Sequence, residues 1–180
     1  MDSLEVQVLF AGAATASACV ASVFDLRERR IPNWVTGPVL LAGLAAHTFT
    51  THWKGLAETA AAALLGGAIF LLFHLAGGMG AGDVKLMAAC AGVTGLSGLG
   101  TLLIATGIFG ALFGLCVSVF RGVFRQSLAN TCAVLAHHST QGLTPHPEFN
   151  LRRGTGIRLP FALPIAAGCA FTLATLLVHP

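Results

Sequence analysis

Long apolar runs, separated by short polar or glycine-rich stretches, make up most of this sequence. Only 9% of its 180 residues are charged, whereas a soluble domain carries roughly 25%. A chain of this length fits one domain. We therefore expect an all-α fold over residues 1–180: a polytopic membrane helix bundle in contact with membrane lipid.

The apolar runs predict about six transmembrane helices. A break is expected from Gly95 to Gly98, and the span that begins at Leu159 is interrupted early by Pro160 and Pro164. Residues 47–55 read as a polar loop between the second and third spans. The predicted spans are about 4–24, 34–49, 56–75, 84–94, a fifth that ends at 120, and 159–178.

The stretch at about 121–158 differs in composition from the spans. It is basic and holds two prolines, and we expect it to form a cytoplasmic loop. Apolar residues recur there at helical spacing and predict an amphipathic helix on the membrane surface, namely Phe124, Leu128, Cys132 and Leu135. Residues 137–150 read as loop.

The basic residues predict the orientation of the bundle. With the N-terminus outside, every lysine and arginine except Lys54 falls on the cytoplasmic side. The same orientation places Asp25 and Asp83 together on that side. We therefore expect these two carboxylates to meet in space.

Asp83 stands between two apolar runs and follows a glycine-rich stretch. Four glycines fall within residues 77–82. A carboxylate beside hydrocarbon is energetically costly and is a functional candidate by default. The glycines allow close approach of a second helix or of a bound peptide. Asp25, at the end of the first run, is the one comparable feature in the sequence.

Two carboxylates in one site tend to share a single proton, because repulsion disfavours ionising both. One member can then activate a water molecule as a base, while the other protonates a carbonyl oxygen or a leaving amine. Asp83 is expected at a helix N-terminus and Asp25 at a helix C-terminus. The helix dipoles then favour Asp83 as the base and Asp25 as the proton carrier, although coupled groups titrate as a pair.

These residues carry a family resemblance. Gly80-Ala81-Gly82-Asp83 matches the GxGD signature of membrane aspartic proteases, and its continuation to Leu86 resembles the signature of type IV prepilin peptidases. The stretch Asp25 to Asn33, with Ile-Pro-Asn at its end, is similar to that family's first aspartate motif. Leu159-Pro160-Phe161, followed by Ala166-Ala167-Gly168, resembles its last span. Presenilin-like proteases match less well, because neither a Tyr-Asp pair nor a Pro-Ala-Leu motif is present.

The resemblance implies a leader peptidase, multi-pass in the bacterial inner membrane. It would cut the leader from pilin-like precursors at the cytoplasmic face, with Asp25 and Asp83 as the catalytic pair. Gly80, Gly82 and Lys85 are candidate substrate-binding residues. We expect no metal, no other cofactor and no nucleic-acid partner.

Methyl transfer to the product is not expected. Larger family members carry an insert with paired CxxC motifs and also N-methylate the product. Here the five cysteines form no CxxC pair, and only residues 26–33 separate the first two spans. The small size resembles the subgroup that serves tight-adherence (Flp) pili.

Simpler interpretations exist for each of these residues. Asp83 could be a helix cap, Asp25 an interfacial charge beside Arg29, and Lys85 a side chain that snorkels to the membrane surface. His74 and Glu58 receive no role. At the level of function, the alternatives are a small proton-coupled transporter, which usually shows repeats that are missing here, and a non-catalytic scaffold of a secretion complex.

Overall fold

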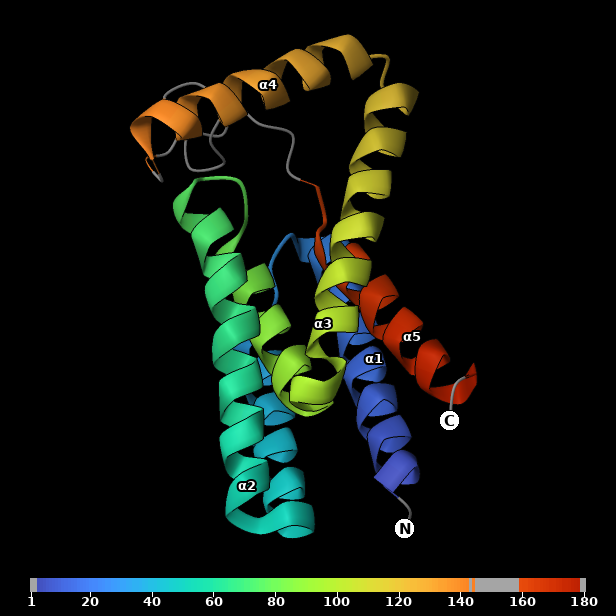
Figure 1. The fold of residues 1–180 in the computed structure, drawn as a ribbon. Coiled ribbons are helices and arrows are strands. Elements are labelled where there is room, and N and C mark those ends of the chain that lie inside the picture. Colours follow the sequence, from blue (N-terminus) through green and yellow to red (C-terminus); the bar gives the residue numbers. More distant parts are fainter. Residues whose placement is uncertain (1–2, 143, 145–158, 179–180) are drawn as a thin grey trace.

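The computed structural model describes residues 3–142, 144 and 159–178. Within them the chain forms helices and no strand, and three of the helices are long and apolar enough to cross a membrane. This confirms the expected helical membrane bundle. The helices are α1 (Ser3–Glu28), α2 (Asn33–Leu75), α3 (Ala81–Phe120), α4 (Phe124–Gln141) and α5 (Ala162–Val178) (Figure 1).

Helices α2 and α3 each contain a break, and Figure 1 shows both turning back on themselves. The break in α3 lies at Gly95, whose φ of 77° is rarely adopted by residues with a side chain. The break in α2 lies at Thr51 and His52. With α1 and α5, these halves make six apolar helical segments. The number that crosses a membrane, and the orientation, stay predictions.

The polar loop expected at 47–55 is wrong in extent, since only Thr51 and His52 leave the helical conformation. Threonine hydroxyls bond to carbonyls one turn earlier, as Thr48 Oγ1 does to the Leu44 carbonyl at 2.6 Å. A polar side chain satisfied in this way can remain in a helix. The polar residues at 47–55 therefore predict the position of the break correctly but predict too long a loop.

His47 connects the two breaks. Its Nε2–H donates to the carbonyl of Val93 at 2.9 Å, and its ring stacks on Phe10 with centroids 4.1 Å apart. Val93 lies just before the break at Gly95, where a helix leaves carbonyls without regular partners. His47 therefore caps the first half of α3 from the neighbouring helix.

We expect His47→Leu to lower the free energy of unfolding by about 1–3 kcal/mol, because it leaves the Val93 carbonyl without this donor. Thermal unfolding of the purified protein in detergent measures the change. His47→Gln retains an N–H donor and serves as the control, with a smaller loss expected. Equal stability of the leucine variant and the wild type would contradict this assignment.

The connection between the first two helices is shorter than expected. Helix α1 does not end at Phe24 but continues to Glu28, so Asp25 lies in its last turn. The chain then turns within residues 29–32, with Arg29 in the left-handed region at φ 51°. The carboxyl end of α1 is thus held directly beside the start of α2.

Helix α5 packs against both α1 and α3. It begins at Ala162 rather than at Leu159. Pro164 lies in its first turn, where a missing N–H removes no helical hydrogen bond, so this proline does not interrupt the helix. Small side chains make the contact close, since Ala14, Ala18 and Ala162 are fully buried.

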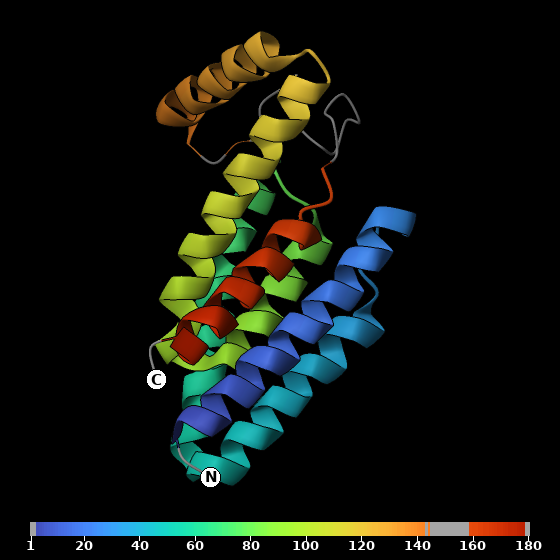
Figure 2. The same ribbon diagram turned by 90° about the vertical axis from the view of Figure 1, so that its right-hand side faces the viewer.

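Helix α4 lies across the end of the bundle opposite the two termini (Figures 1 and 2). Its packing partner is α3, and Phe124, Leu128 and Leu135 are exposed along it. The predicted amphipathic segment is therefore a helix, while its place on a membrane surface stays a prediction. The loop expected at 137–150 is wrong at its start, because α4 continues to Gln141; residues 145–150 lie outside the described residues.

Candidate active site

Asp25 and Asp83 line the same pocket, which has a volume of about 840 Å³. Its walls come from the end of α1 with the connection to α2, from the last turn of α2, from the turn before α3 with the first turn of α3, from the last two turns of α3, and from residues 159–161 before α5. The structure thus brings together the two carboxylates that the sequence paired.

Asp83 is the third residue of α3 and is only 9% exposed. Its Oδ2 accepts a hydrogen bond from the backbone N–H of Gly80 at 3.2 Å, so it caps its own helix from inside the first turn. A Cβ at Gly80 would lie 3.1 Å from that oxygen. Glycine at this position leaves room for the carboxylate to fold back.

Asp25 is half-buried, and its Oδ2 accepts the backbone N–H of Ala162 at 3.3 Å. Ala162 is the first residue of α5, so the positive end of a helix dipole faces this carboxylate. From the sequence, only the negative dipole end at the C-terminus of α1 was expected to act on Asp25. Both carboxylates accept a hydrogen bond at a helix N-terminus, and the dipoles therefore do not assign the base and the acid.

The two carboxylates interact electrostatically. The charge of Asp25 acts on Asp83, and Arg29 acts on Asp25 with the opposite sign. Two carboxylates in one pocket, one buried and one half-buried, are suited to holding a single proton between them. Among the described residues, no group of three or more His, Cys, Asp or Glu side chains is placed to hold a metal ion.

Two other candidate site residues, Gly82 and Lys85, contact the region where the chain passes from α1 into α2. A Cβ at Gly82 would lie 3.2 Å from Cβ of Ile31, so Gly82 permits close packing of that connection. Lys85 Nζ donates to Oδ1 of Asn33 at 2.9 Å. Gly80, Gly82 and Lys85 all line the pocket, and their binding of substrate stays a prediction.

Sequence reasoning assigned no role to several residues that line this pocket or bond to residues lining it. His74 lines it, and its Nδ1–H donates to the Met79 carbonyl at 2.8 Å, which holds the turn before α3. The backbone N–H of Ala162 and the side chain of Asn33 were also missed. Two sequence features pointed to these residues. Ala162 follows the segment 159–161 at the start of the predicted last span, and Asn33 ends the Ile-Pro-Asn motif.

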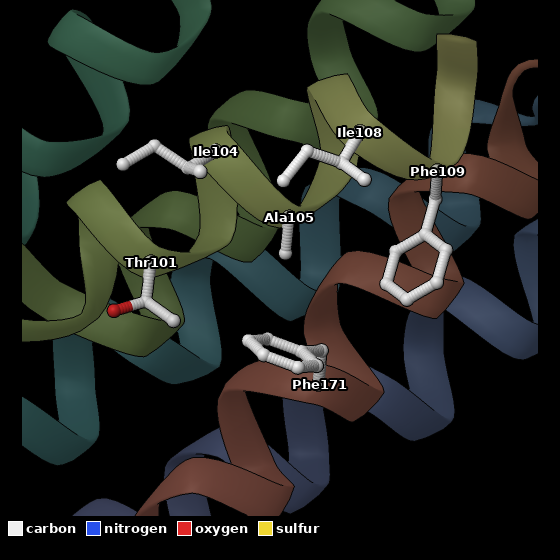
Figure 3. Close-up of a pocket in the computed structure, with 6 residues that line it drawn as sticks. All are labelled: Thr101, Ile104, Ala105, Ile108, Phe109 and Phe171. Carbon is white, nitrogen blue, oxygen red and sulfur yellow. The ribbon is translucent and has the colours of Figure 1, made fainter. Parts of the chain in front are cut away.

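A second pocket, of about 220 Å³, lies between α3 and α5 (Figure 3). Phe171 of α5 points toward α3, with its ring centroid 6.2 Å from that of Phe109. Ile104 and Ile108 are largely exposed. No lining side chain is titratable, so we place no acid–base chemistry there. The lining residues are Thr101, Ile104, Ala105, Ile108, Phe109 and Phe171.

The chain matches the model of the type IV leader peptidase family over residues 13–115, which is more than half of its length and includes both aspartates. No curated protein and no solved structure matches the chain. The chain belongs to the type IV leader peptidase family and is a membrane-associated, prepilin peptidase-like protease.

Proposed function

We propose that the protein is an aspartic endopeptidase that removes the leader of pilin-like precursors at the cytoplasmic face of the bacterial inner membrane. Asp25 and Asp83 are its catalytic pair, and no metal or cofactor takes part. The observation that carries this proposal is that both carboxylates line one pocket, where each accepts a backbone N–H at the start of a helix.

The chemistry needs one proton, one water molecule and the scissile peptide bond. The ionised carboxylate takes a proton from water as the oxygen attacks the peptide carbonyl carbon, and the protonated carboxyl donates its proton to the carbonyl oxygen. Collapse of the tetrahedral intermediate breaks the C–N bond, and a proton passes to the leaving amine. Either aspartate can play either part, because both are held by a backbone N–H.

The lining of the pocket favours recognition of the precursor through its apolar segment. Apolar side chains from α3 and from the segment before α5 form one wall, including Phe113, Val117 and Phe161. The pocket also holds several cations, such as Arg29 and Arg121, which repel a basic leader. We propose that small residues at the cut and the adjacent hydrophobic helix carry the specificity.

We further propose that the enzyme cleaves without methylating the product, as in tight-adherence pilus systems. Methyl transfer requires a donor pocket, and residues 29–32 between α1 and α2 are too few to fold as one.

The decisive experiment places the purified protein in proteoliposomes with a pilin-like reporter, S-adenosylmethionine and no ion gradient. Mass spectrometry should find the leader removed and the new N-terminus unmethylated. A transporter or a scaffold would leave the reporter intact. A methyl group that depends on this protein alone would refute the peptidase-only proposal.

The orientation has its own test. We expect a tag inserted at Gln141, the last residue of α4, to be cytoplasmic, and one at the break near Thr51 to be periplasmic. The reason is the distribution of basic residues, of which Lys54 alone falls on the outer side. Protease protection in intact cells and spheroplasts measures both positions. A periplasmic tag at Gln141 would overturn the six-span topology.

A further inference from the structure

The connection between α1 and α2 contacts the start of α3 at two points. Ile31 packs against Gly82, where even a Cβ would lie 3.2 Å from the isoleucine. One turn of α3 later, Nζ of Lys85 donates to Oδ1 of Asn33 at 2.9 Å, a contact between residues 52 positions apart. The two contacts flank Asp83 along α3, and the connection begins one turn after Asp25.

We propose that Asn33 and Lys85 form a positioning pair that sets the separation of the two aspartates. The inference rests on the proposed function, because it assumes that Asp25 and Asp83 act together. Lys85 is thereby a positioning residue rather than a substrate-binding one, and Asn33 joins the site.

The chemistry of the pair supports this role. Asn33 and Lys85 are both exposed, and Lys85 lines the pocket, so their contact adds little to the buried core. The lysine donates to a neutral amide oxygen. A hydrogen bond with a charged donor is the stronger kind and fixes direction as well as distance.

The positions of the aspartates show what the contact adds. Asp25 lies in the last turn of α1 and Asp83 in the first turn of α3. Helices α1 and α3 pack against each other and both pack against α5, which sets their overall placement. The Asn33–Lys85 hydrogen bond acts closer to the site, because it ties the start of α2, just after the connection at residues 29–32, to the turn of α3 that carries Asp83.

The first experiment is a double-mutant cycle on leader cleavage with Lys85→Met and Asn33→Leu. We expect each single variant to lower kcat about five- to tenfold with KM within about twofold, since one charge-assisted hydrogen bond is lost. The double variant should be no slower than either single one. Lys85→Arg should keep most of the activity. Lys54→Met removes the one other lysine and should leave the rate unchanged.

Two outcomes would overturn the proposal. A raised KM with unchanged kcat would make Lys85 a substrate-binding residue, and fully additive losses would mean that the two side chains act independently. The exchanged pair, Asn33→Lys with Lys85→Asn, should recover activity relative to the single variants. If the exchanged pair recovers no activity and the losses of kcat in the single variants add in the double variant, the contact is excluded.

A second experiment reads the geometry without turnover. In the inactive Asp25→Cys/Asp83→Cys protein, oxidative cross-linking reports how often the two positions meet, with Asp25→Cys alone as the control for the native cysteines. Adding Lys85→Met should slow the cross-link about fivefold or more. An unchanged rate would refute the positioning role. Failure of the proposed function looks different, because either the wild-type protein would leave the reporter intact or an Asp25→Asn protein would still cleave it.

Discussion

Asp25→Asn and Asp83→Asn are each expected to lower the rate of leader cleavage by roughly 10²–10⁴-fold, the range that one acid–base group contributes. Asparagine preserves the size of each side chain, and its carbonyl oxygen can still accept the N–H of Ala162 or Gly80. What it cannot do is exchange a proton with water or with the substrate. Single-turnover cleavage of a precursor by purified enzyme in liposomes measures the loss.

Glu28→Gln is the matched control for this pair. Glu28 ends α1, is exposed and does not line the pocket, so its variant should cleave at the wild-type rate. Substantial turnover by either aspartate variant would remove that residue from the mechanism. Loss of membrane insertion would instead mark a folding defect, which detergent extraction and size-exclusion chromatography detect.

Gly168→Ala is expected to lower the free energy of unfolding by about 1–3 kcal/mol, because it overpacks the contact between α5 and α3. A Cβ at Gly168 would collide with Oγ1 of Thr106 and lie 3.0 Å from the Thr106 backbone nitrogen. Thr106 is only 1% exposed and has little space to move away. Gly168→Leu should add a loss of cleavage of about tenfold or more, as α5 shifts and Ala162 withdraws from Asp25.

Gly107→Ala tests whether the effect belongs to the contact rather than to the amino acid. Nothing lies within 4 Å of a Cβ at Gly107, so this variant should be as stable as the wild type or slightly more stable. Thermal unfolding in detergent compares the variants. A Gly168→Ala protein with wild-type stability would show that α5 approaches α3 less closely than the structure indicates.

Apolar periodicity and glycine placement predicted much of the bundle. The break at Gly95 was predictable, because glycine readily adopts the positive φ that a break needs, and Gly95 has a φ of 77°. The end of α1 and the loop at 47–55 were misplaced for a shared reason. Polar residues signal an interface with water, but they remain helical when a hydroxyl or the next turn satisfies the backbone, as Thr48 does.

The pairing of Asp25 and Asp83 was predictable from the distribution of basic residues, because the orientation predicted from them places both aspartates on the same side of the bundle. The partner of Asp25 was not predictable in the same way. Its hydrogen bond comes from a backbone N–H, which every residue except proline possesses, so no side chain in the sequence marks it. Asn33 and Lys85 are 52 positions apart, and only the packed helices bring them together.

The hydrogen bond from Ala162 to Asp25 joins residues 137 positions apart. During synthesis, a chain that has inserted only α1, α2 and α3 already contains both aspartates. Asp25 then still lacks the donor that α5 supplies, and one wall of the pocket is missing because residues 159–161 have not yet been added. The order of translation therefore makes this pocket one of the last parts of the protein to be completed.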